Sequence, residues 1–303
     1  MTLKNTSILD TTSKHDGSLI YVWRKRLLFV GPSIKARTRK YVPCYLMFCL
    51  DGPLKITVKG ESDVLECRMV LVPASTEITC HNENQSLAVL YLDYFNEDFE
   101  VLQIKANRKY GPVYWDFEEN IETYCLTVLH ELNNHQLGID AADGLITALH
   151  LRLHRFDNFC DVGDERLKRI IGLMIMGKLG KNYKISDAAD AVGLSVPRVV
   201  QLFKKSFNMT FKEFRNKFKM HIFVISIAMG RSHSQAAQDA GYVDSSHFCK
   251  HFKAQTGIQA SNFFDPDLKT KFFVEESVKD YFEQTIHQES PAELYSSVAS
   301  VSS

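Results

Sequence analysis

Long apolar runs are missing from this chain, and so is the cysteine spacing of a metal or disulfide framework. The segment 44–50 is among the longest apolar stretches, far short of the ~18 residues that a membrane-spanning helix needs. Seven cysteines without a Cys-x-x-Cys pair argue against a structural zinc site and against paired disulfides. The polar segment 1–6 lacks the features of a secretory signal. We therefore expect a cytoplasmic protein with reduced thiols and no membrane partner.

Net charge is also lacking, because 36 Lys and Arg balance 36 Asp and Glu over 303 residues. The balance is uneven along the chain. Residues 165–265 hold 16 Lys and Arg against 7 Asp and Glu, a surplus of +9, which leaves 20 against 29 elsewhere, a deficit of −9. A cationic segment of this kind favours a polyanionic partner, although a merely basic surface is the alternative on charge alone. The length fits two domains, each able to bury a core.

Short alternating segments dominate the first hundred residues. They end at Gly, Pro or Asp, as strands of an antiparallel barrel or sandwich do. The predicted strands cover residues 26–30, 45–50, 54–59, 68–73 and 87–92.

The period then becomes helical over residues 117–156, which predicts a helical hairpin after the strands. Its apolar positions are Ile121, Tyr124, Cys125, Val128, Leu129, Leu132, Leu145, Ile146, Leu149 and Leu153. Residues 157–163 read as a linker, residues 165–264 as helical throughout, and residues 266–303 as an acidic tail with a Ser-rich, disordered end. The predicted domains are therefore 1–160, 165–265 and the tail.

An internal repeat lies in the cationic segment. Ala189-x-x-x-Gly193 recurs as Ala237-x-x-x-Gly241, at an offset of 48 residues. After each glycine the offset becomes 49, and apolar positions such as Val199 and Phe248 then correspond, which indicates one inserted residue in the second turn. One such pattern is weak evidence, but two copies in the cationic segment predict two related helical units.

Each unit reads as a helix-turn-helix. A small residue lets two helices cross closely, and a glycine allows the left-handed turn between them. Ser195 and Ser245 have the residue type of a helix N-cap, and Pro197 suits the first turn of the helix that follows. The second helix of each unit buries an apolar face and leaves a polar, basic face outside, which suits the major groove of DNA.

At this point the sequence resembles the AraC/XylS family of bacterial transcription regulators. The resemblance covers residues 165–264 and rests on Ile185–Ser195, Leu202–Phe207, Ala237–Tyr242, His247–Phe248, His251–Lys253 and Thr256–Ile258. It implies two helix-turn-helix units joined by a long helix, here Phe211–Met229, which enter successive major grooves. The N-terminal strands resemble the family's cupin-like sensor barrel less specifically. The implied fold is α+β, with that antiparallel barrel and helical hairpin before an all-α domain.

The resemblance also implies roles for individual residues. Base-facing positions would be Pro197, Arg198 and Gln201 in the first unit and Ser246, His247 and Lys250 in the second. Phosphate contacts would come from Ser195, Lys204, Lys205 and Lys253. The implied partners are double-stranded DNA, RNA polymerase, a small-molecule effector and a second copy of the chain, without a cofactor or metal.

The chain departs from the family pattern around the second unit. Ala236 and Ala240 stand where larger aliphatic residues are usual, and Phe223 replaces a small residue of the connecting helix. His233 replaces an apolar residue, and Ala260 replaces a proline. Lost apolar area costs about 0.8 kcal/mol per methylene. We therefore expect the second unit to pack loosely and the first to dominate DNA binding.

Other motifs in the sequence give weaker evidence for a function. Residues 16–80 contain no histidine, so a metal-dependent barrel enzyme is a remote alternative. The stretch 24–40 carries seven Lys and Arg and no acid, which suits either an anionic effector or a charged sheet edge. His130 and His135 lie about 140° apart on a helix and cannot share a metal, whereas His150 and His154 could. A near phosphate loop at 172–179 lacks its final Ser or Thr, and Cys249 is expected to pack.

The sequence thus predicts a sequence-specific DNA-binding transcription regulator rather than an enzyme, controlled through an N-terminal sensor. A cytoplasmic sensor or protein-interaction module without DNA binding is the main alternative. The basic recognition faces favour the regulator.

Overall fold

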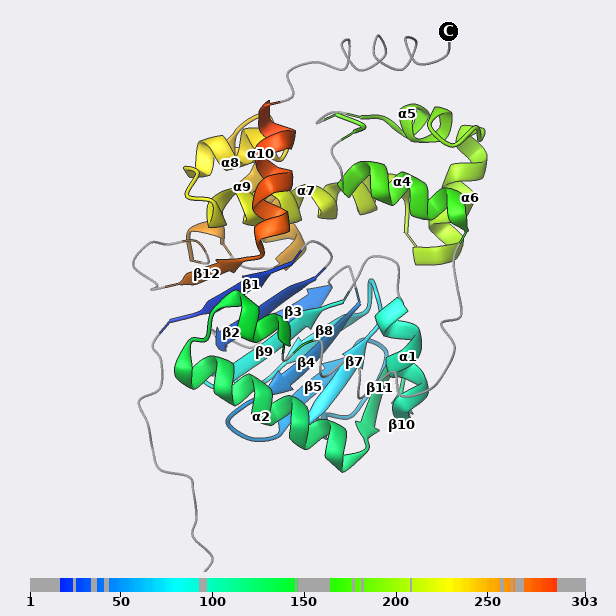
Figure 1. Cartoon of the computed structure of the whole chain (residues 1–303). Helices are drawn as coiled ribbons and strands as arrows, with labels where there is room; N and C mark the ends of the chain where they lie inside the picture. Colours follow the sequence, from blue (N-terminus) through cyan, green and yellow to red (C-terminus); the bar gives the residue numbers. More distant parts are fainter. Residues whose placement is uncertain are drawn as a thin grey trace, which may run out of the picture.

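A computed structural model describes residues 17–23, 26–33, 37–40, 44–92, 97–144, 146, 164–175, 178–180, 183–207, 209–256, 259–262, 264 and 270–287. Several predictions fall outside these residues: the linker, His150, His154, Leu149, Leu153 and the Ser-rich end. The strands gather in one part of the molecule together with the helices of residues 97–135, and the helices of residues 165–256 lie in another part (Figure 1). None of the helices in the described part of the chain combines the length and apolar character that crossing a membrane requires.

The larger sheet has the strand order β10-β11-β7-β4-β9-β2-β1-β12. Its strands are β1 (Leu19–Val22), β2 (Leu27–Pro32), β4 (Tyr45–Cys49), β7 (Met69–Val72), β9 (Ser86–Tyr91), β10 (Ala106–Tyr110), β11 (Val113–Phe117) and β12 (Lys271–Val274). All neighbouring pairs in this sheet are antiparallel except β1 with β12, which is parallel. The central strands are apolar on both faces because both faces of the sheet are covered.

A smaller sheet has the order β3-β8-β5-β6 and is antiparallel. It consists of β3 (Arg37–Lys40), β5 (Leu54–Val58), β6 (Leu65–Cys67) and β8 (Glu77–Cys80). A shared core that includes Met47, Ile56, Val70 and Ile78 fills the space between the two sheets. The described strands therefore form two facing sheets that do not close into a barrel, which is the sandwich form of the predicted antiparallel barrel or sandwich. The larger sheet extends sideways through β12 and the β10–β11 hairpin instead of closing on the smaller one.

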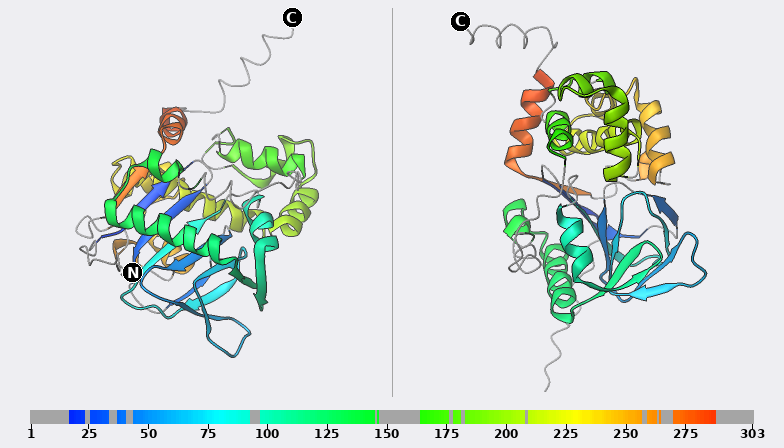
Figure 2. Two further views of the ribbon diagram at one scale, coloured as in Figure 1. Left: turned by 60° about the horizontal axis from the view of Figure 1, so that its bottom comes forward. Right: turned by 90° about the vertical axis from the view of Figure 1, so that its right-hand side faces the viewer.

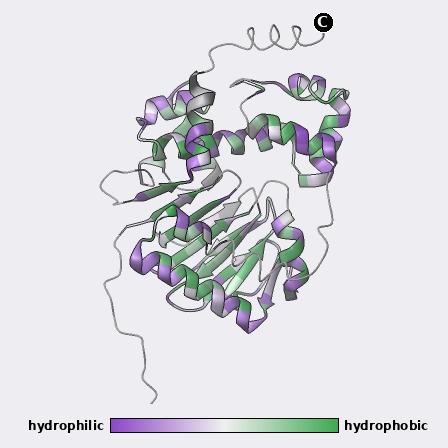
Figure 3. Ribbon diagram, in the orientation of Figure 1, coloured by the Kyte–Doolittle hydropathy of each residue, from purple (hydrophilic) through white to green (hydrophobic). Residues whose placement is uncertain are grey.

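Helix α2 (Glu119–His135) covers the other face of the larger sheet (Figure 2). Its buried residues Ile121, Cys125, Val128, Leu129 and Leu132 follow the predicted spacing. They pack on sheet residues such as Phe48 and Leu71, and Figure 3 shows the resulting alternation of hydrophobic and hydrophilic colour along the helix. Residues 139–144 start a second helical segment, as the hairpin prediction required, and α1 (Glu97–Lys105) precedes β10.

The C-terminal helices form the predicted all-α part. They are α4 (Glu165–Ile175), α5 (Ile185–Asp190), α6 (Val196–Phe207), α7 (Phe211–Ala228), α8 (His233–Asp239) and α9 (Ser245–Thr256), followed by the short 3-10 helix η1 (Ala260–Asn262). α4 includes the first half of the near phosphate loop, residues 172–175, and the apolar residue Met174 of this half is buried. The connecting helix α7 begins and ends within one residue of the prediction.

The segment after the second unit carries structure that the sequence analysis did not assign. β12 pairs with β1 at the edge of the larger sheet, and α10 (Glu276–His287) follows it (Figure 1). Val278 and Phe282 of α10 share a core with Ile20 of β1 and Ile225 of α7. Phe273 stacks on Tyr21, with ring centroids 4.7 Å apart. Residues 271–287 therefore join the sheets to the helices.

Candidate nucleic-acid interface

The first helix-turn-helix unit consists of α5 and α6. Ala189 is buried where the helices cross, and Gly193 adopts a left-handed φ of 64°. Two hydrogen bonds close the turn: the Gly193 N–H donates to the Asp190 carbonyl at 3.2 Å, and the Leu194 N–H donates to the Ala189 carbonyl at 3.0 Å. This is the pattern with which a glycine ends a helix, because it satisfies carbonyl groups that the helix leaves open.

The second unit, α8 and α9, repeats both of these hydrogen bonds. Gly241 has a φ of 73°, and Ala237 is buried. The Gly241 N–H donates to the Gln238 carbonyl at 2.9 Å, and the Tyr242 N–H donates to the Ala237 carbonyl at 2.8 Å. The repeat read from the sequence is therefore a repeat of backbone geometry.

The start of the second helix differs between the units. In α6 the Ser195 carbonyl accepts from the Arg198 and Val199 N–H groups, so Ser195 is the N-cap residue as predicted. In α9 the cap is Asp244 and not Ser245, which lies within the helix. The Asp244 carboxylate accepts from the His247 N–H at 2.7 Å. The inserted residue of the second turn accounts for this correction, and a carboxylate suits the positive end of the helix dipole.

Both second helices bury one face and expose the other. Val199 and Phe203 of α6 are buried, as are Phe248 and Phe252 of α9. All ten residues with a predicted DNA contact are exposed: Ser195, Pro197, Arg198, Gln201, Lys204, Lys205, Ser246, His247, Lys250 and Lys253. An Arg198 guanidinium nitrogen donates to the Gln201 side-chain oxygen at 3.1 Å. The expectation that Cys249 packs inside is wrong, because its side chain is exposed on α9.

The second unit is not loosely packed, which corrects a further expectation. Phe223 of α7 is fully buried and stacks on Phe248 with ring centroids 3.4 Å apart. It also meets Phe264 at 5.1 Å, edge to face. Ala236 and Ala240 line the same core. The large residue on α7 thus fills the space that Ala236 on α8 and Ala240 at its C-cap leave, so these three departures from the family pattern compensate for one another.

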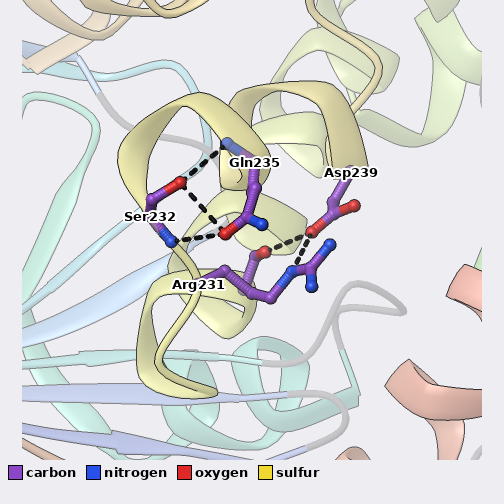
Figure 4. Close-up of polar contacts among 5 residues, drawn as sticks. Arg231, Ser232, Gln235 and Asp239 are labelled. Carbon is purple, nitrogen blue, oxygen red and sulfur yellow. Dashed lines mark hydrogen bonds and ion pairs between the residues drawn. The ribbon is translucent and has the colours of Figure 1, made fainter.

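Polar contacts fix the joint between α7 and α8 (Figure 4). Ser232 and Gln235 form a capping box, in which the Gln235 N–H donates to the Ser232 hydroxyl at 3.3 Å and the Ser232 N–H donates to the Gln235 side-chain oxygen at 3.1 Å. The buried Ser226 hydroxyl donates to the Asp239 carboxylate at 2.7 Å, and Arg231 donates to the same oxygen at 3.2 Å. These bonds hold the second unit at a set angle to the connecting helix.

A cluster of cationic and aromatic groups supports the turn before α9. The Lys219 ammonium donates to the Gly241 carbonyl at 2.5 Å and lies 5.6 Å from the centre of the Tyr242 ring. Burial, and then the neighbouring Arg215, lower the pKa of Lys219. Tyr242 shares a hydrogen bond of 2.9 Å with His251, whose pKa is lowered by burial and by His247, Lys217 and Lys219. The second recognition helix is therefore positioned by charged groups from α7.

Comparison with known proteins agrees with this geometry. Residues 188–265 match the family model of a helix-turn-helix domain. Structures of ToxT from Vibrio cholerae are similar at low identity. The apo form shares 15% identity and a TM-score of 0.56 over 79% of this chain and 97% of ToxT. An unsaturated fatty acid-bound form shares 15% and 0.52 over 79% and 95%, and a form bound to (E)-4-(8-methylnaphthalen-1-yl)but-3-enoic acid shares 15% and 0.54 over 79% and 98%. None of the curated proteins compared with the chain matches it significantly.

Tandem helix-turn-helix units with basic outer faces, joined to an antiparallel-rich sheet domain, define a DNA-binding transcription regulator. The match places a helix-turn-helix domain at residues 188–265, within the part of the chain that resembles the AraC/XylS family, and the likeness to ToxT shows a shared fold.

Proposed function

We propose that α6 and α9 bind successive major grooves of an operator. The observation that supports this most strongly is the repeated turn, with the same two hydrogen bonds and a glycine at positive φ, which presents a polar, basic helix face in each unit. Pro197, Arg198 and Gln201 face bases in the first unit, and Ser246, His247 and Lys250 face bases in the second.

Affinity in this proposal comes chiefly from the phosphate backbone. Lys204, Lys205 and Lys253, with Ser195, bind phosphates and release counterions, so affinity falls steeply with salt. The two recognition helices read half-sites about 34 Å apart, one turn of the duplex.

Selection of bound sequences from random duplex DNA with the full chain tests the proposal. We expect a recurrent motif with two half-sites. Lys204→Glu with Lys205→Glu should abolish binding to that motif, and the matched control is Lys178→Glu with Lys212→Glu, which reverses two exposed charges outside the recognition helices. Equal losses of DNA affinity in both double variants would mean that binding depends on overall charge and not on the recognition helices, which would contradict the proposal. The absence of any sequence preference across salt concentrations would also overturn it.

We further propose that the sheet domain binds an anionic, largely apolar effector. Similarity of fold to ToxT, which was solved with an unsaturated fatty acid, supports this proposal, as does the acid-free basic stretch 24–40. The test is the melting temperature of the full chain with a long-chain cis-unsaturated fatty acid and with its methyl ester as control. A rise with the acid alone is expected. No rise, or equal rises with acid and ester, would contradict a carboxylate-specific site.

The remaining roles are also proposals: a cytoplasmic homodimer that contacts RNA polymerase and has no enzymatic activity. The helices after the sheets are the proposed dimer contact. Sedimentation equilibrium would give the oligomeric state, and transcription in vitro from a template carrying the selected operator would show activation or repression. A monomer at micromolar concentration, or a transcript level unchanged by the protein, would refute the respective role.

A further inference from the structure

Two exposed valines stand out on the first recognition helix. Val196 is 37% exposed and Val200 is 43% exposed. They lie one helical turn apart, so they share a face. Among the described residues, large exposed apolar side chains also occur at Val64, Ile104 and Val243. Two of these five side chains thus lie on a single helix of 12 residues.

Packing within the chain accounts for only part of these two side chains, since 37% of Val196 and 43% of Val200 stay exposed. A β-branched residue is a poorer helix former than alanine, lysine or glutamate, so an exposed helix position gains no local stability from valine. Exposed apolar area also gains nothing from burial, because the core side of α6 is already occupied by Val199 and Phe203. Residues that break local rules without a structural gain are expected at functional sites.

The two valines lie beside the predicted base-facing residues of the same helix. Val200 follows Pro197 by three positions and Val196 by four, so the three form a continuous apolar strip on the helix surface. Gln201 lies beside this strip, and its side-chain oxygen is held by Arg198 at 3.1 Å. An amide next to an apolar strip matches an A·T pair, because adenine offers N6 and N7 to a glutamine while thymine offers its C5 methyl group.

We propose that α6 reads thymine methyl groups through Val200 and Val196, so that the half-site of the first unit contains A·T pairs at these positions. The inference rests on the proposed DNA binding and specifies which base chemistry the first unit selects. α9 has a different face, since the position equivalent to Val200 is Cys249 and Ser246 stands where α6 has Pro197. The two half-sites should therefore differ in sequence, and only the half-site bound by α6 should require thymine methyl groups.

The test uses the full chain and the duplex recovered by selection, with each thymine replaced singly by deoxyuridine, which lacks the C5 methyl group. We expect one or two replacements, confined to one half-site, to weaken wild-type binding about fourfold each, which corresponds to the ~0.8 kcal/mol of a buried methylene-sized group. Val200→Ala should weaken binding to the thymine duplex by a similar factor and should show no further loss with deoxyuridine at that position. Val64→Ala, an exposed valine between β5 and β6, is the matched control and should bind like wild type.

The outcomes separate this inference from the proposed function. If selection recovers no motif, the proposed DNA binding fails and the inference falls with it. If a motif is recovered and no deoxyuridine replacement affects wild-type binding, only the inference is overturned. Equal losses in wild type, Val196→Ala and Val200→Ala at every sensitive thymine would also overturn it, because the methyl groups would then contact residues other than these two valines. Unchanged melting temperatures of the variants would show that the effect is not one of folding.

Discussion

Replacing Phe223 by alanine should open the second helix-turn-helix unit and leave the first intact. Phe223 is 0% exposed, with Phe248 at 3.4 Å and Phe264 at 5.1 Å between ring centroids. A buried Phe→Ala change costs about 3–5 kcal/mol, and aromatic pairs add about 0.5–1.5 kcal/mol each. Collapse is limited here because Ala236 and Ala240 cannot extend into the space. We expect a local loss of about 4 kcal/mol.

Hydrogen exchange followed by mass spectrometry measures this loss by segment. Peptides from α8 and α9 should exchange up to about 1,000-fold faster in Phe223→Ala, whereas peptides from α5 and α6 should be unchanged. Phe203→Ala, at the equally buried ring of the first unit, should give the reverse pattern.

A second-site change tests the compensation directly. Ala236→Leu added to Phe223→Ala restores the family's arrangement of a small residue on the connecting helix and a larger aliphatic residue on α8, so it should recover part of the protection. Equal exchange in both units, or a double variant no better protected than Phe223→Ala, would refute compensation between α7 and α8.

Three further changes test other parts of the molecule. Arg26 forms a bidentate ion pair with Asp98 at 2.7 and 2.8 Å, and the Asp98 side chain is only 3% exposed. Arg26→Ala should therefore lower the free energy of unfolding, measured by urea titration, by about 3 kcal/mol, because it leaves a buried carboxylate without this partner. A loss below about 1 kcal/mol would contradict this reasoning. Burial lowers the pKa of His221 to about 4 from its ordinary 6.5. The unfolded chain therefore binds the proton first as the pH falls. Stability is full above pH 6.5 and should drop by roughly 2 kcal/mol at pH 5, a drop that His221→Gln should remove; an equal drop in this variant would assign it elsewhere. Gly193→Ala should lower the melting temperature through a cost of about 1–2 kcal/mol, because φ is 64° while an added Cβ meets no atom within 4 Å. Gly138→Ala, equally open but without a positive φ, should be neutral, and equal shifts in the two variants would contradict a conformational cause.

Local patterns predicted the parts of the fold that depend on local physics. The five predicted strands correspond to β2, β4, β5, β7 and β9, since each alternates or is apolar and ends at a turn residue. The tandem units were predictable because a glycine at positive φ and a small residue at a helix crossing leave a recognisable spacing. The ten predicted contact residues are exposed on or beside the recognition helices, and their role in binding stays a prediction.

Features that depend on long-range contacts could not be predicted from local sequence patterns. β12 has only four residues and pairs with β1, which lies near the other end of the chain, so the sequence around β12 does not predict a strand. The sequence predicted loose packing of the second unit because Phe223 departs from the family pattern. Spacing alone does not show that Phe223 fills the space beside Ala236 and Ala240. Asp244 was overlooked as a cap because Ser245 next to it has the same propensity. The charged strand β3 does lie at a sheet edge, which agrees with one of the two readings of the basic stretch.

The parallel pairing of β1 with β12 has a consequence for biosynthesis. During translation the larger sheet lacks its outermost strand until the ribosome has produced both helix-turn-helix units. A nascent or prematurely terminated polypeptide exposes the apolar edge around Ile20 and Val22, which Val274 and Phe282 cover in the finished molecule. The larger sheet is therefore complete only once the segment that follows the DNA-binding half has been synthesised.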